Sequence, residues 1–354
     1  MLHHRNLIPA AVLLPILLSS HVPGDRIRFS PSEGSSATKT FENKAEFTLQ
    51  SMKLAMNGSE PPTKPEMEMT ITSTQKVVVT DDYLGNRDGA PKKLRRSFDE
   101  LGNSVAISMK MQMMGNTQNQ DKNTTGESEL QGKKVVFTWD DDKGEYRKAF
   151  EPAADKDNLL KDLDEDMDLR ELLPKDEVKE GGEWDIDVKK LASVLAPGGN
   201  LSIVPKEAEG AESSGMDMPG MSSVGEWLRG ALDGSATGKF KGVREVDGAK
   251  MGVIEVTAKI SVSKDMTDMV EEMMKKAKQP VEMQVDHMDV DFKMEATGEL
   301  VWDLAAGHAH SFSISGPSHV NMDMAMKVDA QGQKMSIDYG MELSGTMGLT
   351  LEVK

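Results

Sequence analysis

Few side chains in this chain of 354 residues combine the type and the spacing that a chemical site needs. His308 and His310 stand two positions apart, so a β-strand would place both imidazoles on one face. A turn at residues 315–318 would return the next strand alongside, with His310 opposite Met324. The same register sets His308 beside Met326. Because imidazole and thioether ligands suit Cu(I), these residues form a candidate copper site, with sheet residues near an open rim as the alternative.

A second group of methionines lies in a polar segment. Met216, Met218 and Met221 fall within residues 204–221, which are rich in Glu, Gly, Ser and Pro and are expected to form a mobile loop. Thioether sulfur is a soft metal ligand, and methionine also adapts well to hydrophobic contacts. Three interpretations therefore stay open: a copper site, a lid or partner contact, and a loop without a role.

Four aspartates alternate as calcium ligands do, namely Asp162, Asp164, Asp166 and Asp168. A calcium loop also needs glycine at its sixth position and glutamate at its twelfth. Met167 and Leu173 stand there instead. Because leucines recur at helical spacing through the same stretch, the aspartates are expected to form the solvated face of a helix. Asp157 would cap this helix, and Pro174 would mark its end.

No catalytic or nucleotide-binding motif is complete. Residues 234–240 contain Gly and Lys, but the glycine spacing is too short for a phosphate-binding loop, and Phe240 replaces the required Ser or Thr. The chain has no cysteine, which excludes a thiolate nucleophile, a disulfide and a cysteine-based zinc site. The sequence therefore predicts a protein that is not an enzyme and uses no cofactor.

Net charge and the first residues bear on partners and location. A formal charge of −17 argues against binding to nucleic acid, because a phosphate backbone requires a basic face. Residues 1–20 combine a short basic start, an apolar run and small residues, as secretory signals do. We expect an exported protein, periplasmic or extracellular, with no transmembrane segment after signal removal.

The region from Pro280 to Lys354 shows the clearest secondary-structure pattern. Apolar residues recur at every second position, which is typical of antiparallel strands with one covered and one wet face. Turn residues at 315–318 divide the region into four or five consecutive strands. The apolar phase slips near Asp286 and His287, so the sequence predicts a bulge or a break there.

The rest of the chain follows a simple order. We predict an α+β fold, predominantly antiparallel β, with one or two curved sheets, open or half-barrel, and a few short helices. The expected divisions are a signal peptide at 1–20, a flexible lead-in at 21–38, a β-rich half at 39–150, a helical and loop centre at 151–237, and a β-meander half at 238–354 with a helix at 263–278.

A short internal echo links the two β-rich halves. Trp139-Asp140 is followed by Gly144, and Trp302-Asp303 is followed by Gly307 at the same distance. The tryptophan can pack on a sheet, the aspartate can bond turn amides, and the glycine can take a positive φ. Two independent hairpins of one type explain the echo as well as a duplication does.

This echo, together with Leu173-Pro174, Val178 and Gly182-Glu183-Trp184, resembles uncharacterised exported bacterial proteins with a β-rich fold. The resemblance covers most of residues 40–350 and implies a leader, a β-rich half and a C-terminal sheet. It carries no function. More distantly, a curved antiparallel sheet with inserted helices resembles the half-barrels of bacterial lipoprotein carriers, which is an analogy of fold alone.

The abundance of methionine suggests a function, although its ordinary role is to fill a core. The chain has 27 methionines, and several would lie on strand faces or on the helix at 263–278. We expect a hydrophobic ligand or protein partner to bind a methionine-rich sheet face. The candidate residues are Phe312, Met322, Met324, Met326, Met269 and Met273. A structural or interaction protein of the cell envelope is the alternative, and copper handling is the third interpretation.

Overall fold

The computed structural model describes residues 26–60, 66–113, 116–154, 157–206, 231–276, 282–330 and 333–354. The expected signal peptide at 1–20 and the methionines Met216, Met218 and Met221 lie outside the described residues. What the sequence suggests for them stays a prediction.

Thirteen strands in the described part of the chain form a single, predominantly antiparallel sheet. The expectation of a predominantly antiparallel β fold with few helices is thereby confirmed, and the described strands form one sheet where the sequence left one or two open. The strands are β1 (Ser36–Met56), β2 (Glu66–Arg87), β3 (Ala90–Met113), β4 (Asn116–Ser128), β5 (Lys134–Asp140), β6 (Glu145–Phe150), β7 (Glu183–Ile186), β8 (Ile203–Pro205), β9 (Asp233–Val246), β10 (Ala249–Asp265), β11 (Glu282–Asp303), β12 (His308–Ala330) and β13 (Gln333–Val353).

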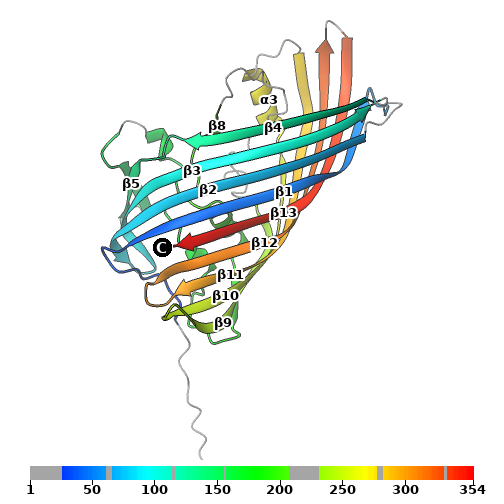
Figure 1. Cartoon of the computed structure of the whole chain (residues 1–354). Helices are drawn as coiled ribbons and strands as arrows, with labels where there is room; N and C mark the ends of the chain where they lie inside the picture. The colour runs from blue at the N-terminus through cyan, green and yellow to red at the C-terminus, as the bar shows by residue number, and fades with distance from the viewer. Residues whose placement is uncertain are drawn as a thin grey trace, which may run out of the picture.

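The two β-rich halves of the chain meet where the first long strand pairs with the last. β1 pairs with β13 over most of its length, so the order runs β6-β5-β3-β2-β1-β13-β12-β11-β10-β9-β7. β3 is long enough to serve two partners: β5 pairs with its first part and β4 with its last part. Figure 1 shows the result, one strongly curved open sheet.

The helices are short. They are the 3-10 turns η1 (Asp157–Leu159), η2 (Arg170–Leu172) and η3 (Val188–Lys190), and the α-helices α1 (Leu191–Leu195) and α3 (Thr267–Lys276). α3 starts later than the predicted 263, because β10 keeps its pairing with β11 as far as Asp265. The helix expected between Asp157 and Pro174 is wrong: only its two ends form 3-10 turns, and the buried residues between them, such as Leu163 and Met167, join the core without a continuous helix.

The C-terminal region contains three strands where the sequence suggested four or five. The turn predicted at 315–318 is wrong, because β12 continues straight through it. Gly316 permits this: a Cβ at this position would overlap the backbone oxygen of Glu295, so the two strands approach there more closely than any side chain allows. The predicted phase slip is confirmed as a register shift in β11 between Val285 and His287.

Both copies of the Trp-Asp turn have the predicted geometry. Asp140 Oδ1 accepts hydrogen bonds from the amides of residues 142 and 143, and Gly144 has a φ of 69°. Asp303 Oδ1 accepts from the amides of residues 305 and 306, and Gly307 has a φ of 72°. Trp302 is fully buried, so this aspartate-tryptophan pair fixes one hairpin to the core.

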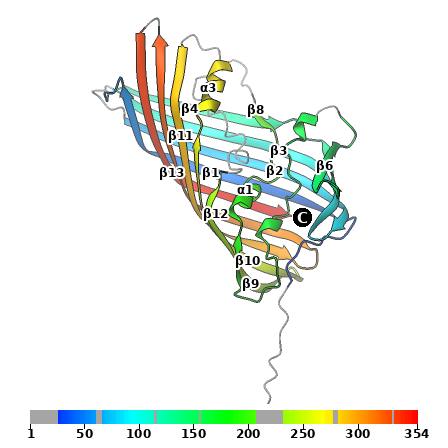
Figure 2. The ribbon, with the colours of Figure 1, turned by 180° about the vertical axis from the view of Figure 1, so that it is seen from behind.

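The concave face of the sheet is covered over part of its length. We name the two ends of the sheet after β1, the Ser36 end and the Met56 end. Residues 157–206, the central segment, pack against the concave face toward the Ser36 end and contribute Leu163, Leu172 and Leu191 to one continuous core. Figure 2 shows α1 inside the curve of the sheet. Asn43 of β1 donates to the carbonyl of Leu195 at 3.4 Å, which marks how far α1 reaches along that strand.

The stretch before β1 differs from the flexible lead-in that the sequence suggested. From Arg26 onward it is packed: Ile27 and Phe29 are buried, and the Ser30 amide donates to the carbonyl of Gly307 at 2.8 Å. The alternation of charged and apolar residues there is that of an extended segment with one face on the core.

Candidate functional site

Methionines from six strands gather at the Met56 end of the sheet. The cause is the antiparallel order: β1 and β3 reach this end with their last residues, β2, β11 and β13 with their first, and β12 with its last. Pairing then sets these side chains next to one another, as with Met67 beside Met111 and Met69 beside Met109. We call the inward side chains of this end the methionine face. They are Met52, Leu54, Met67, Met69, Met109, Met111, Met288, Val290, Met322, Met324, Met326, Ile337, Tyr339 and Met341.

The strand registers arrange part of this face in rows. In one row Met52, Met341 and Met322 are direct neighbours. In the next row Leu54, Tyr339, Met324 and Met288 follow one another. Met322 and Met341 are buried, whereas all four side chains of the second row keep partial exposure. The apolar surface therefore continues past the closed core into a part that solvent reaches.

Side-chain chemistry changes along the same strands. Toward the Ser36 end the inward positions carry Phe41, Leu351, Phe312, Leu300 and Ile254, which form one cross-strand row. All five are 0–2 % exposed, and the core that they join includes the central segment. Stiff aromatic and branched residues thus occupy the half that the protein fills itself, and flexible methionines occupy the half that it leaves partly open.

α3 borders the methionine face. The amide of Met266 donates to the carbonyl of Met288 at 2.7 Å, and the amide of Met288 donates to the hydroxyl of Thr267 at 2.8 Å. These two bonds hold the start of α3 against β11 at the point where β10 ends. Figures 1 and 2 show α3 beside the sheet near this end. Met269 on this helix is half-buried, and the side chain of Met273 lies outside the described residues.

The opposite face of the same strands is polar. His287 and Asp323 pair across β11 and β12 at 2.7 Å, and Lys327 pairs with Asp286 at 2.8 Å. The hydrogen bond to Asp323 raises the pKa of His287. The hydrophobic surface at the Met56 end therefore lies on the concave side.

Comparison with known proteins adds no identity. No protein-family model and no curated protein matches this sequence. Solved structures give weak matches that span most of both chains: an outer membrane channel from Pseudomonas putida F1 (7 % identity, 92 % of this chain and 97 % of that chain, TM-score 0.20), Pseudomonas aeruginosa OccK7 (6 %, 90 % and 98 %, 0.14) and the Escherichia coli outer membrane protease OmpT (8 %, 92 % and 98 %, 0.10). At these TM-scores nothing about this chain is inferred from them. In the described part of the chain, no helix has the length and apolar character needed to cross a membrane.

A second cluster, of buried charges, lies on the concave face near the Ser36 end. Lys39 of β1, Asp81 of β2 and Arg96 of β3 point inward and are 0–1 % exposed. Arg96 donates two hydrogen bonds of 2.7 Å to the carboxylate of Asp81, and Lys39 Nζ lies 2.7 Å from the same carboxylate. Such a bidentate pair combines charge with fixed geometry.

The central segment supplies the other half of this cluster. Asp168 Oδ1 accepts from Tyr83 at 2.7 Å and lies 2.8 Å from Lys39 Nζ. Arg96 also donates to the backbone carbonyls of residues 164 and 165, at 3.0 and 2.8 Å. Glu165 and Asp166 share the guanidinium of Arg170, at 2.5 and 3.0 Å. Lys39, Asp81 and Arg96 of the three neighbouring strands thus hold the central segment on the sheet.

The pKa values of two of the four carboxyl groups in this cluster are shifted in opposite directions. Burial alone would raise the pKa of Asp81, but Arg96 and Lys39 outweigh it and bring that pKa to about 2. Burial dominates at Glu165 and raises its pKa to about 7, with Arg170 opposing and Asp166 adding to the rise. Within the described residues, Glu165 Oε1 and Asp168 Oδ2 are buried without a hydrogen-bond partner. The cluster holds three cations and four carboxylates, so a protonated Glu165 balances it.

Solvent does not reach the centre of the charged cluster, so a ligand could not bind there. We therefore assign the cluster a structural role, which is to attach the central segment to the sheet. The expectation that Asp162 to Asp168 form a solvated helix face is wrong for Asp168, which is fully buried. Sequence reasoning also passed over Lys39, Asp81 and Arg96. A signal existed: each stands in phase with the buried apolar residues of its strand, where an alternating pattern places no charge.

Glu165→Gln is expected to flatten the pH dependence of stability. A carboxyl whose pKa is raised by folding from 4.5 to about 7 keeps its proton in the native state, so its stabilising contribution is present at low pH and is lost as pH rises through this window. The loss amounts to at most about 3 kcal/mol by neutral-to-alkaline pH. Urea unfolding of both proteins between about pH 5 and pH 8 measures it.

The matched control for this experiment is Glu171→Gln, which removes an exposed carboxylate paired with Lys190 at 2.8 Å. His287, whose pKa is raised by its hydrogen bond to Asp323, is present in all three proteins, so the informative quantity is the difference between each variant and the parent at every pH. Parallel curves for the parent and Glu165→Gln would contradict the assigned pKa.

The structure separates several residues that the sequence placed together. His308 and His310 lie at the start of β12, whereas Met324 and Met326 lie near its other end, so the proposed His–Met pairing is wrong. The reason is the missing turn at 315–318. No group of three or more His, Asp or Glu residues in the described ranges is arranged to hold a metal ion. Phe312 belongs to the closed core, away from Met322, Met324 and Met326, which do share one face.

Proposed function

We propose that the protein is a non-enzymatic binding protein, exported from the cytoplasm, that holds a flexible hydrophobic molecule such as an acyl chain on the methionine face. One observation carries the proposal: the inward face of a single curved sheet is fully packed at one end and methionine-rich and partly exposed at the other. Stabilisation of the fold alone does not require that aromatic and branched residues give way to methionine where the side chains become partly exposed.

The dimensions of the face suit such a ligand. From Met322 to Met326 along β12, the inward side chains of the methionine face span roughly 13 Å at about 3.3 Å per residue, and the face extends across six neighbouring strands. Methionine side chains adapt to ligands of varied shape because they are unbranched and polarizable. The curved open sheet would act as a half-barrel around the ligand, with α3 at its rim. Most of the binding free energy would come from burying apolar surface, at about 25 cal/mol per Å².

Met324→Glu is expected to abolish binding of an acyl chain while leaving the fold intact. Met324 is half-buried on the methionine face, so a charge there would have to be desolvated by the ligand. The measurement is titration with the fluorescent fatty acid cis-parinaric acid, together with native mass spectrometry of protein purified from an exporting host. A stoichiometric lipid-like mass in the parent that is lost in the variant supports the proposal.

The matched control is Asn321→Glu, which introduces the same charge on the exposed convex side of the same strand. It is expected to bind like the parent. Equal binding by Met324→Glu and Asn321→Glu, or a parent that carries and binds no lipid, would refute the proposal.

A structural or interaction protein of the cell envelope is the second candidate. The observation that favours it is the closed core under the central segment, which buried ion pairs attach to the sheet. Such a filled core supports a structural role more than the binding of a ligand. A parent protein that stays a bare polypeptide in the presence of lipid, yet is retained by envelope proteins, would favour this function.

A further inference from the structure

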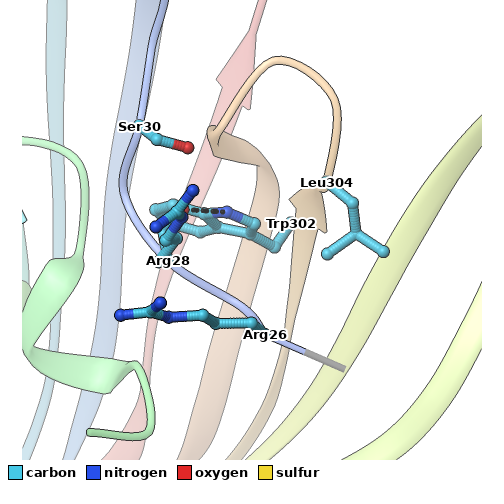
Figure 3. A pocket seen from close by; sticks show the side chains of 5 residues that line it. All are labelled: Arg26, Arg28, Ser30, Trp302 and Leu304. Atoms are coloured by element: carbon cyan, nitrogen blue, oxygen red, sulfur yellow. Dashed lines mark hydrogen bonds between the residues drawn. The ribbon is translucent and has the colours of Figure 1, made fainter. Parts of the chain in front are cut away.

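A small cavity at the Ser36 end carries unusual chemistry for so acidic a chain. Its volume is about 250 Å³, and its lining is Arg26, Arg28, Ser30, Trp302 and Leu304. Figure 3 shows Arg26 and Arg28 on the same stretch of chain, on one side of the indole of Trp302, with Leu304 on the other side. The arrangement follows from the alternation of residues 26–30, because Ile27 and Phe29 turn inward and the three polar residues turn outward.

The backbone that carries these arginines is held at several points. Trp302 Nε1 donates to the carbonyl of Arg28 at 3.2 Å, and the Ser30 amide donates to the carbonyl of Gly307 at 2.8 Å. Gly307 has a positive φ, and a Cβ there would collide with the backbone of Ser30. Phe29 packs edge-on against Tyr83, with ring centroids 5.7 Å apart. The cavity is therefore built on a fixed backbone.

Both arginines lack an acidic partner in the described part of the chain. Neither Arg26 nor Arg28 has a carboxylate within ion-pair distance among the residues that the structure describes. Every other arginine there has an acidic or aromatic partner, namely Arg87, Arg95, Arg96, Arg147, Arg170 and Arg244. In a chain of net charge −17, acidic partners are plentiful, so two unpaired neighbouring arginines are a specific feature.

We propose that this cavity binds a phosphate group, carried by a soluble small molecule or by a lipid headgroup. Two guanidinium groups can donate in parallel to the oxygens of one phosphate, and the Ser30 hydroxyl adds a further donor. Leu304, which is partly exposed, would contact the part of the ligand next to the phosphate. The site lies at the opposite end of the strands from the methionine face and is independent of the function proposed above.

Isothermal titration of the full chain with inorganic phosphate tests the proposal. The parent is expected to show saturable binding, and the double variant Arg26→Gln/Arg28→Gln is expected to bind at least about tenfold more weakly, because it loses both guanidinium groups that donate charged hydrogen bonds to the phosphate. The control Arg147→Gln/Arg244→Gln removes the same charge from two surface ion pairs and should bind like the parent.

Sedimentation with vesicles then distinguishes the two sources of phosphate. Binding to phosphatidylglycerol vesicles but not to phosphatidylcholine vesicles, lost in Arg26→Gln/Arg28→Gln, would assign the site to a lipid headgroup. Phosphate binding without vesicle binding would assign it to a soluble ligand. If the double variant fails to fold, Ser30→Ala, which is expected to weaken phosphate binding without unfolding the segment, replaces it. The proposal is overturned if the parent shows no saturable phosphate binding, or if the control pair loses as much affinity as the arginine pair.

Discussion

Asp81→Asn is expected to lower the free energy of unfolding by about 3 to 5 kcal/mol. The aspartate is fully buried and is the shared partner of Arg96 and Lys39. Removing its charge leaves two cations in the core with too little negative charge around them, and each then loses hydrogen bonds that solvent cannot replace. Urea unfolding near neutral pH, followed by circular dichroism, measures the loss.

The neighbouring residue provides the control. Asp82 pairs with Arg95 at 2.9 Å, but it turns outward and both side chains keep contact with solvent. Asp82→Asn is therefore expected to cost at most about 1 kcal/mol. Equal small effects at both positions would mean that the central segment does not depend on the charged cluster. A large effect confined to Asp81 would confirm that it does.

Gly345→Ala is expected to destabilise the protein by about 4 kcal/mol or to prevent folding, above the usual range for over-packing. Gly345 sits in the middle of β13, where a Cβ would overlap the backbone oxygen of Glu46 on β1. The obstacle is backbone, which cannot turn aside as a flexible side chain can. Because β1 and β13 join the two halves of the chain, separating them there strains the whole sheet.

Gly340→Ala, five residues earlier in β13, is the control. Its Cβ would meet nothing closer than 3.6 Å, at the side chain of Lys53, so no neighbour must move. Alanine also has less conformational freedom to lose than glycine, and the expected change is within about 1 kcal/mol in either direction. Thermal unfolding of the two variants compares them directly. Similar melting temperatures would contradict the close approach of β1 and β13.

The alternating patterns predicted strand phase well, because a half-buried strand must alternate. The register shift near His287 and the two Trp-Asp turns were likewise visible in local sequence, since each depends on residues a few positions apart. β4 shows the limit of this reasoning. Its residues 116–128 are polar throughout and lack the alternation of a half-buried strand, yet they form a strand because β3 offers them a pairing edge.

The methionine residues illustrate a partial success. The sequence placed Met322, Met324 and Met326 on one strand face, as the structure does, because period-two alternation fixes that much. It did not show that methionines of β2 and β3 reach the same end, since this depends on which strands pair. It also joined Phe312 and two histidines to them through a turn that does not exist.

The amino-acid sequence by itself determined the antiparallel β class, the inward and outward sides of most strands, and the two Trp-Asp turns. These properties depend on steric preferences and burial over a few neighbouring residues. Only the tertiary structure decided that one sheet contains both halves, that Lys39, Asp81 and Arg96 meet the central segment, and that Arg26 and Arg28 border a cavity. Such contacts join residues far apart in the chain, and their partners are set by strand order and by the close approach of backbones at glycine, which no local pattern records.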